Sequence, residues 1–235
     1  MDQTTVKILH GIDEIEEKIW DSCVSASTPF NPFLSHKFLS ALEQSKSVTP
    51  ESGWQPFHLV VENGEELVGV VPMYLKSHSQ GEYVFDYGWA DAWQRAGGNY
   101  YPKLQCSVPF TPATGPRMLA RHPSEDNLNT MLNATIEVAE KTKVSSLHMT
   151  FMQQDQWEAA KEQGFLGRID QQFHWHNAGY QTFDDFLADL ASKKRKNLKR
   201  ERRDALENDI SIEWATGNTI TEEHWDAFYH FYVDT

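Results

Sequence analysis

The residues most capable of chemistry lie in the run from Ser192 to Asn208, SKKRKNLKRERRDALEN. Eight of the 21 Lys and Arg residues of the chain fall between Lys193 and Arg203, although the formal net charge is -13. Seven of the eight project to one half of a helical wheel: Lys193, Arg195, Lys196, Lys199, Arg200, Arg202 and Arg203. Like charges on one helix face repel unless an anion offsets them, and the planar fork of Arg suits phosphate. The run therefore predicts an anion site, with a solvated basic face as the alternative.

The candidate anions are the pyrophosphate of coenzyme A, the phosphates of a nucleotide-linked precursor, and a tRNA backbone. The acidic remainder of the chain disfavours DNA. Four apolar side chains share another sector of the same wheel: Phe183, Leu187, Leu190 and Leu198. We therefore expect one basic helix over about residues 183–207, or two nearly collinear helices with a kink near Ser192. Thr182 and Asp185 make a capping box at its start.

A second candidate site lies in the segment FDYGWADAWQRAGGNYYPK. Five of its side chains could line a substrate groove: Tyr87, Trp89, Tyr100, Tyr101 and Lys103. Asp86 or Asp91 could act as the catalytic general base for an attacking amine, because acyl transfer to nitrogen requires loss of a proton. The competing interpretations are a pinned Ω-type loop and structural acids that cap a turn.

A third candidate site lies in VPFTPATGPRML, which holds a tight turn at Thr114-Gly115-Pro116. We expect this segment to wall the substrate groove through four residues: Phe110, Thr111, Thr114 and Gly115. Arg117 follows the turn and could contact an anionic group. A coenzyme-binding loop is disfavoured because the turn has a single glycine and prolines remove N–H donors. Plain turn geometry is the other alternative.

Other reactive arrangements are weaker. His174 and His176 have the i, i+2 spacing that can ligate a metal, but no third ligand is evident and we expect no metal. Cys23 and Cys106 cannot form a disulfide framework, and we expect both to be small buried side chains. No apolar run is long enough for a transmembrane helix, and the acidic N-terminus is unlike a signal peptide. A cytoplasmic location is the default expectation.

The elements that position these residues follow from hydrophobic periodicity and turn signals. Helices are expected over 12–22, 34–45, 124–143 and 155–165, and from Thr221 onward. Strands are expected over 57–61, 67–75, within 82–87, over 103–108, 145–151 and 171–177. The pair Asn63-Gly64 predicts a hairpin turn, and Pro72 implies an edge or a bulge. This order predicts an α/β (α+β) fold with a mixed sheet flanked by helices.

Two long motifs in one order resemble the FemAB-like family of bacterial GNAT-fold proteins, often described as peptidoglycan biosynthesis/recognition. The motifs are GEYVFDYGWADAWQRAGGNYYPKLQCSVPFTPATGPRML and FHWHNAGYQTFDDFLADLASKKRKNLKRERR, so the resemblance spans roughly Gly81 to Arg203. The layout is also similar, more distantly, to Fem-type aminoacyl ligases. The resemblance implies two tandem GNAT-like halves. Residues 1–170 would form the first half, and residues 171–235 would begin a second, incomplete half of a chain cut short.

The resemblance further implies an N-acyltransferase. Such a protein moves an acyl or aminoacyl group from acyl-CoA or aminoacyl-tRNA to an amine acceptor, mainly by positioning donor and acceptor. The basic helix would orient a phosphate-bearing small molecule, a cell-wall precursor or a tRNA. One alternative is a non-catalytic peptidoglycan or precursor recognition module of the same fold, which the missing glycine-rich coenzyme signature favours. Another is an RNA-binding accessory protein that works through the basic helix.

Overall fold

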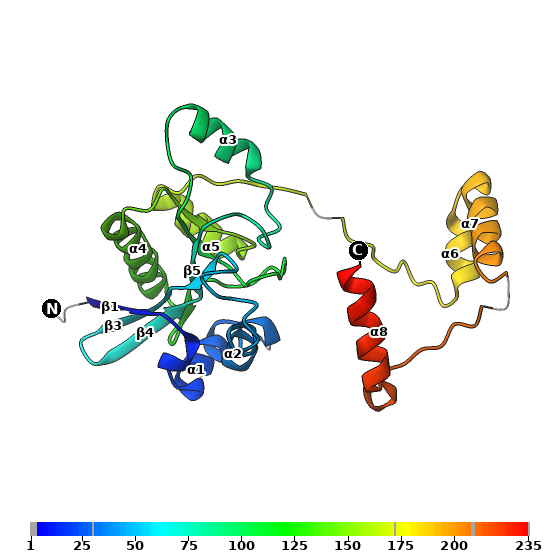
Figure 1. The fold of residues 1–235 in the computed structure, drawn as a ribbon, viewed down its shortest axis with the longest axis horizontal. Coiled ribbons are helices and arrows are strands. Elements are labelled where there is room, and N and C mark those ends of the chain that lie inside the picture. Colours follow the sequence, from blue (N-terminus) through cyan, green and yellow to red (C-terminus); the bar gives the residue numbers. More distant parts are fainter. Residues whose placement is uncertain (1–3, 30, 172, 208–209, 235) are drawn as a thin grey trace. The chain divides into compact units, whose positions relative to one another are not determined.

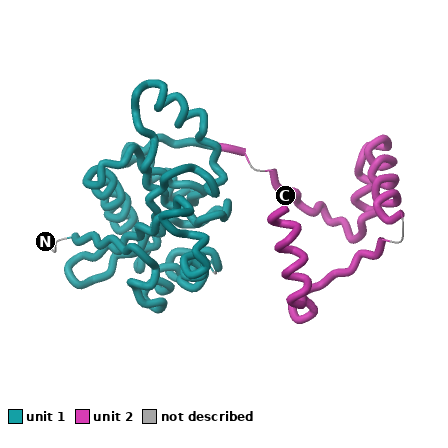
Figure 2. Tube along the Cα trace, viewed as in Figure 1, with its two compact units in different colours: residues 1–169 teal, residues 170–235 magenta. Residues whose placement is uncertain are grey.

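The chain forms two compact units, residues 1–169 and 170–235 (Figure 2). The computed structural model describes residues 4–29, 31–171, 173–207 and 210–234. The strands, all in the first unit, are β1 (Thr4–Leu9), β2 (Trp54–Pro56), β3 (His58–Asn63), β4 (Glu66–Val71), β5 (Met73–Lys76), β6 (Lys103–Cys106), β7 (Leu119–Ala120) and β8 (Leu147–Met149). Its helices are η1 (Ile12–Glu14), α1 (Glu17–Ser27), η2 (Pro32–Leu34), α2 (His36–Gln44), α3 (Tyr87–Arg95), α4 (Glu125–Thr142) and α5 (Gln154–Glu162).

The first sheet has the order β1-β3-β4-β7 and is antiparallel throughout. Its alternating apolar residues enter two clusters, one on each face. Trp20 of α1 and Leu39 of α2 pack with Val60 and Val70 on one face. Met131 of α4 packs with Val61 on the other face. Figure 1 shows α1 and α2 on one side of these strands and α4 on the other, so the first sheet is covered on both faces.

The second sheet has the order β2-β5-β6-β8, with β6 and β8 parallel and the other pairs antiparallel. The chain passes from the first sheet to the second at Pro72, between β4 and β5. The expected single return strand over 67–75 is therefore wrong. Pro72 lies at neither an edge nor a bulge, because both flanking strands have neighbours on each side. A proline lacks the N–H that a continuous ladder would need, so the strand breaks there.

Several expected elements are confirmed. Ser124 caps α4 by accepting a hydrogen bond from the Asn127 N–H, and acidic residues occupy the first turn. Ser35 caps α2 through the Phe38 N–H. The strands around 103–108 and 145–151 appear as β6 and β8, and α5 is followed by Gly164 at φ +92°. The mixed α/β class of the fold is confirmed.

Other expectations are wrong. Residues 82–86 form no strand, and the expected aromatic loop is the helix α3, because the segment WADAWQR between flanking glycines is made mainly of residues that tolerate a helix. The N-terminal strand β1 was not expected, and α1 begins at Glu17 after a short 3-10 turn at Ile12–Glu14. Among the described residues of 171–177 no strand forms, since no neighbouring strand pairs with them.

The second unit contains α6 (Phe183–Asp189), α7 (Ser192–Asp204), η3 (Gly217–Thr219) and α8 (Glu222–Val233). The capping box of Thr182 and Asp185 opens α6 as expected, and Thr221 opens α8 in the same way. The expectation of one helix or two collinear helices is wrong. Leu190 and Ala191 adopt extended backbone angles, so α7 turns back and lies beside α6 (Figure 1).

Candidate functional site

A buried polar face on the second sheet brings together titratable side chains of the first unit. The pairing register places Lys76 opposite Lys103 across β5 and β6, and Gln105 opposite His148 across β6 and β8. Since side chains alternate along a strand, the intervening Leu75, Leu104 and Leu147 point to the apolar core. The polar members are Tyr74, Lys76, Lys103, Gln105, Ser107, His148 and Thr150; all but half-buried His148 are buried.

Lys103 is the centre of this face. Its side chain is fully buried, and its ammonium group has three N–H donors. Three oxygen acceptors surround Nζ: Ser79 Oγ at 2.9 Å, Glu82 Oε2 at 2.8 Å and Asp86 Oδ2 at 2.6 Å. Because every donor has an acceptor, Lys103 holds the segment 79–86 against β6 and is poorly placed to act as a nucleophile.

Two tyrosines join the cluster from the segment before β6. The Tyr100 hydroxyl donates to Asp86 Oδ2 over 2.9 Å, and the Tyr101 hydroxyl lies 2.7 Å from Ser79 Oγ. Lys103 Nζ lies 5.4 Å and 5.8 Å from the two ring centroids, within the range of cation–π attraction. Four residues expected to form a site, Asp86, Tyr100, Tyr101 and Lys103, are thus brought together in one place.

The pKa values of the two carboxyl groups in the cluster, Glu82 and Asp86, shift in opposite directions. Burial raises the pKa of Glu82, and the attraction of Lys103 offsets this only in part. Burial acts on Asp86 in the same direction, but the hydrogen bonds and charge of Lys103, with Ser79 and Tyr100, hold its pKa below the usual value. Asp86 is therefore ionised, and its Oδ2 already accepts from Lys103 and Tyr100, which favours a positioning role over proton abstraction.

His148 forms part of the rim of the cluster, with a quarter of its side chain exposed. Its Nδ1 lies 3.5 Å from Lys103 Nζ, so a proton on Nδ1 would face an ammonium group. Burial and the Lys103 charge lower the pKa of His148 to about 4. The position of Nδ1 beside the ammonium group favours the tautomer with its proton on Nε2, while Asp86 Oδ2, 4.0 Å from Nδ1, opposes it. His148 is a hydrogen-bond donor at neutral pH rather than a charged group.

Lys76 is the second buried lysine of the polar face. Its Nζ lies 3.5 Å from the Trp54 ring centroid and donates to the Gln80 carbonyl over 3.3 Å. Burial lowers its pKa to about 7, despite the opposing attraction of Glu82. Unlike Lys103, it has no ion pair among the described residues, so its charge is weakly compensated.

The aromatic residues of α3 lie outside the cluster. Tyr87, Trp89 and Asp91 are exposed, and the Arg168 guanidinium lies 5.8 Å from the Trp89 ring. Asp86 directly precedes α3 and bonds to Lys103, and Tyr100 follows α3 and donates to Asp86. The cluster therefore fixes both ends of α3 and leaves its aromatic side chains at the surface. The assignment of Asp91 as a base stays a prediction.

The segment 108–117 borders the same sheet. Half-exposed Phe110 packs on Trp54 with ring centroids 5.5 Å apart, and the Thr111 hydroxyl donates to the Pro109 carbonyl. Thr114 is exposed, whereas Gly115 is buried and pairs with Met152 in an isolated parallel bridge. Phe110 therefore reaches the edge of the polar face. The groove role of Thr111, Thr114 and Gly115 stays a prediction.

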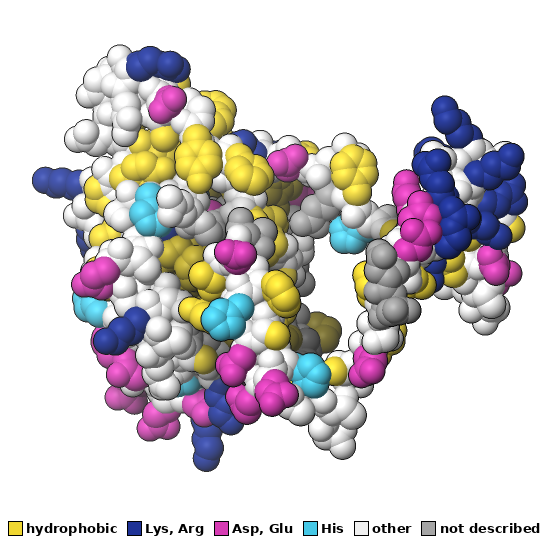
Figure 3. Space-filling model, turned by 45° about the vertical axis from the view of Figure 1, so that its right-hand side comes forward, with side chains coloured by type: hydrophobic (Ala, Val, Ile, Leu, Met, Phe, Trp, Pro, Cys, Tyr) yellow, Lys and Arg dark blue, Asp and Glu magenta, His cyan; other side chains and the backbone are white. Residues whose placement is uncertain are grey.

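The basic residues of α7 form two stripes rather than one face. Lys199 pairs with Asp184 of α6 at 3.3 Å, and the Arg202 guanidinium lies 4.2 Å from the Phe183 ring. Arg195 is half-buried on this stripe. The outer stripe follows i, i+3, i+7, i+10 spacing and consists of Lys193, Lys196, Arg200 and Arg203. Figure 3 shows Lys and Arg side chains gathered on the surface of the second unit.

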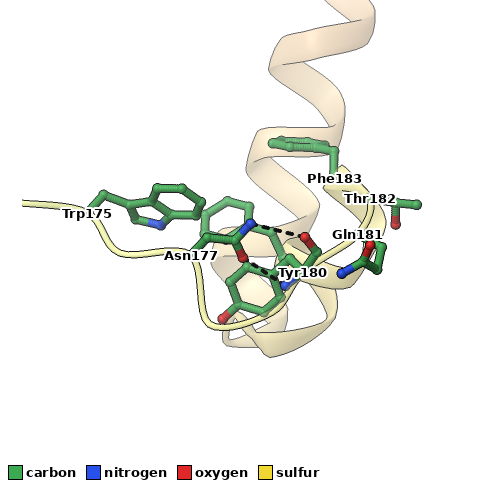
Figure 4. A pocket seen from close by; sticks show the side chains of 7 residues that line it. Trp175, Asn177, Tyr180, Gln181, Thr182 and Phe183 are labelled. Atoms are coloured by element: carbon green, nitrogen blue, oxygen red, sulfur yellow. Dashed lines mark hydrogen bonds between the residues drawn. The ribbon is translucent and has the colours of Figure 1, made fainter.

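A shallow aromatic hollow of about 430 Å³ lies beside α6 in the second unit (Figure 4). Trp175, Tyr180, Phe183 and Phe186 line it together with Asn177. Asn177 donates to the Tyr180 carbonyl over 3.1 Å and accepts from the Tyr180 N–H over 2.8 Å, which holds the rim. A neighbouring hollow is lined by Phe183, Lys199 and Arg202 among others, so aromatic and cationic surfaces are adjacent.

The sequence alone did not single out Ser79, Glu82, His148 or Lys76. A signal was present in the strands, where MYLK and KLQC alternate apolar and polar residues. Such alternation predicts a solvated face on an antiparallel sheet. Here the segment 79–86 covers that face instead, and this long-range packing has no local sequence signature.

The described parts of the chain show neither a metal-binding cluster nor a membrane-spanning helix. No group of three or more His, Cys, Asp or Glu side chains there could hold a metal ion. The His174 and His176 rings stack with centroids 6.3 Å apart. Cys23 and Cys106 are both buried and unpaired, as expected. None of the described helices is both long and apolar enough to span a bilayer.

Comparison with known proteins identifies the family. Residues 11–235 match the FemAB-like family, described as peptidoglycan biosynthesis/recognition, and the chain belongs to this family. No curated protein matches the sequence significantly. Among solved structures, a ribosomal-protein-alanine N-acetyltransferase from Brucella melitensis biovar Abortus 2308 is similar, with a TM-score of 0.40 and 14% identity. That match covers 74% of this chain and 100% of the other.

Proposed function

We propose that this FemAB-like protein is an N-acyltransferase that transfers an acyl or aminoacyl group to an amine acceptor in peptidoglycan metabolism. The observation that carries the proposal is the rim of the Lys103 cluster. It supports this function because the chain belongs to the FemAB-like family. There, half-buried Tyr100, Tyr101 and His148 stand over a buried ionic network. Donors of this kind, acyl-CoA or aminoacyl-tRNA, place the reaction in the cytoplasm.

The chemistry needs a nucleophile, a positioned carbonyl and a place for the proton. The acceptor amine attacks the thioester or ester carbonyl and the carbon–nitrogen bond forms. The carbon–sulfur or carbon–oxygen bond then breaks, and the departing thiolate or alkoxide takes up the proton that the amine loses. Negative charge develops on the carbonyl oxygen, which a preorganised N–H donor stabilises. His148 Nε2–H suits that role, because the ring is neutral and its Nδ1 is turned toward Lys103.

In the second unit, the basic helix α7 would bind a phosphate-bearing molecule. Lys193, Lys196 and Arg200 form no ion pair among the described residues, so their charge is open to an anion. Phosphate-bearing precursors and tRNA share this chemistry. Their affinity is expected to fall as salt rises.

The test is transfer of radiolabelled acyl groups to peptidoglycan precursors by the purified chain and by the variant His148→Ala. Acetyl-CoA and aminoacyl-tRNA are supplied in separate reactions. We expect turnover with one class of acyl donor. The variant His148→Ala, which removes the proposed hydrogen-bond donor, should lower kcat by about 100-fold or more. No turnover with either class would refute the transferase proposal.

A second candidate function is precursor recognition without catalysis. It is favoured by the lowered pKa of Asp86, whose Oδ2 is held by Lys103, because a carboxylate of lowered pKa is a weak base. Calorimetry with the same precursors separates the two functions. Precursor binding without transfer selects the recognition module, and binding with transfer selects the enzyme.

A further inference from the structure

Two shallow hollows meet at Phe183 in the second unit. The first, of about 430 Å³, is lined mainly by aromatic rings. The second, of about 420 Å³, contains the charged side chains of Lys199, Arg202 and Asp184, and Thr182 and Phe183 belong to the walls of both. Volumes of this size are typical of sites for small organic ligands. A ligand that enters both hollows must therefore carry an aromatic or apolar group next to a charged group.

Three rings set the shape of the aromatic hollow. Trp175 and Tyr180 are nearly parallel, with 25° between the ring planes and 6.5 Å between the centroids. Phe186 stands edge-on to both, at 84° to Trp175 and at 71° to Tyr180. Trp175 is 67% exposed, so much of its ring surface is open to a ligand. Flat aromatic surfaces of this kind stack with other planar rings.

Hydrogen bonds hold the wall of the aromatic hollow in place. The Tyr180 hydroxyl donates to Asp189 Oδ2, and Asn177 bonds to both the N–H and the carbonyl of Tyr180 (Figure 4). The capping box of Thr182 and Asp185 fixes the turn that leads from Tyr180 into α6. Since this wall is already ordered, less conformational entropy is lost when a ligand binds to it.

The second hollow carries one net positive charge from its three charged residues. Lys199 pairs with Asp184 at 3.3 Å, but both side chains are more than half exposed, so the pair is weak. Arg202 forms no ion pair among the described residues, and its guanidinium lies 4.2 Å from the Phe183 ring. This cation–π contact holds the guanidinium at the wall that the two hollows share, and its N–H groups suit a phosphate.

We propose that the two hollows bind an unpaired nucleotide, with its base against Trp175 and Tyr180 and its phosphate beside Arg202. Aromatic rings next to a positively charged groove are the combination with which proteins bind single-stranded nucleic acid. The site deepens the proposed function, in which α7 binds a phosphate-bearing molecule, and rests on it in that respect. A free nucleotide and a nucleotide within a single strand share this chemistry. The outer stripe of α7 is available for the further phosphates of a longer ligand.

The competing explanations are a small apolar cluster that binds nothing and a site for a phosphorylated sugar. Two compounds that each contain half of a nucleotide separate these explanations from a nucleotide site. Adenosine has the base without the phosphate, and ribose 5-phosphate has the phosphate without the base. A nucleotide site requires both halves, whereas a sugar-phosphate site does not require the base.

The experiment titrates the full chain with AMP, adenosine, ribose 5-phosphate and the RNA strand hexaadenylate at constant ionic strength. The readout is the indole Nε1–H resonance of Trp175 in 15N–1H spectra, assigned by its loss in Trp175→Phe. We expect a saturable shift with AMP in the millimolar range or below. Adenosine and ribose 5-phosphate should each bind about tenfold or more weakly than AMP. Tighter binding of hexaadenylate than of AMP would identify a strand as the ligand, and equal affinity would identify a free nucleotide.

Two variants remove the two halves of the site separately, with AMP affinity measured by calorimetry. Trp175→Ala should weaken AMP binding by about tenfold because a stacking surface is lost, and Trp175→Phe should retain most of the affinity. Arg202→Gln should weaken AMP binding by about tenfold or more and leave adenosine binding unchanged. The matched controls are Trp214→Ala and Arg203→Gln, because both residues are exposed in the same unit and line neither hollow.

The nucleotide site is overturned if the response to AMP does not saturate, or if either half of the nucleotide binds as tightly as AMP. It is likewise overturned if the control variants lose as much affinity as Trp175→Ala and Arg202→Gln. The titrations contain neither an acyl donor nor an acceptor amine. A chain that transfers acyl groups without binding AMP would therefore refute this site alone, and a chain that binds AMP without any transfer would refute the transferase proposal alone.

Discussion

Lys103 Nζ and Asp86 Oδ2 lie 2.6 Å apart in the interior of the first unit, where both side chains are at most 1% exposed. Desolvation of two such charges costs several kcal/mol, and the pair is tolerable only because further hydrogen bonds surround it. Glu82, Ser79 and Tyr100 supply them. The pair therefore holds residues 79–86, before α3, and Tyr100, after it, against β6.

The variant Asp86→Asn should destabilise the first unit by about 3 kcal/mol, because it leaves Lys103 with less compensating charge in a buried site. Urea unfolding at pH 7 measures this. Asp91→Asn is the matched control on exposed α3, where a change within about 0.5 kcal/mol is expected. Equal stabilities for the two variants would show that the buried pair is not a structural anchor.

The two buried lysines should respond differently to replacement by methionine. Lys103→Met leaves two carboxylates buried without their cation, so a loss of about 3 kcal/mol or more is expected. Lys76→Met removes a cation whose pKa is lowered to about 7 and which has no ion pair among the described residues. A change within about 1 kcal/mol is expected there. Urea unfolding of both variants at pH 7 is the measurement, and a larger loss for Lys76→Met would contradict the assigned roles.

His148 should make stability depend on pH between about 6.5 and 4. Its folded pKa of about 4 lies below the ordinary value, so the unfolded chain binds more protons in this window. Stability therefore falls as pH falls through it, by roughly 2–3 kcal/mol. Burial contributes most to this lowered pKa, the charges of Lys103 and Arg168 add to it, and Asp86 opposes them.

The difference in unfolding free energy between the unchanged chain and His148→Gln isolates this contribution. It should shrink as the pH is lowered from 7 to 4. Glu82, with its raised pKa, acts in the opposite sense, but it is present in both proteins and largely cancels. A difference that stays constant with pH would show that His148 titrates normally.

Local patterns predicted the elements that depend on neighbouring residues. A polar residue just before apolar residues that repeat at helical spacing predicts a helix start. Three such residues do cap helices: Ser124, Thr182 and Thr221. The expectations for Pro72 and for the described residues of 171–177 are wrong for one reason: strand pairing is decided by partners far along the chain. Alternation in HWH suggests a strand, yet Trp175 packs with Tyr180 and Phe186 instead.

The candidate site shows the same limit. Asp86, Tyr100, Tyr101 and Lys103 could be named because they lie within one short segment. His148 joins them from a strand 45 residues beyond Lys103, through parallel pairing of β6 and β8. Glu82 lies within the same segment, but nothing local marks it as buried, because its burial depends on the path of residues 79–86 over the sheet.

The two stripes of α7 allow anion binding to be tested without disturbing its packing. Lys199 and Arg202 contact α6, so reversing their charge would also remove the contacts to Asp184 and Phe183. The outer residues Lys193, Lys196 and Arg200 have no such contacts in the described structure. The triple change of these three to glutamate should therefore leave the helix pair intact while removing the anion site.

Binding of a short RNA and of inorganic pyrophosphate, measured over a range of salt concentrations, reports the result. We expect the triple variant to lose about tenfold or more in affinity at low salt and to show a flatter salt slope, since fewer counter-ions are released. The matched control reverses three exposed lysines of the first unit: Lys18, Lys37 and Lys141. Both variants change the net charge equally, so an equal loss in the two would mean that total charge governs binding. A loss confined to the α7 variant would assign binding to the outer stripe.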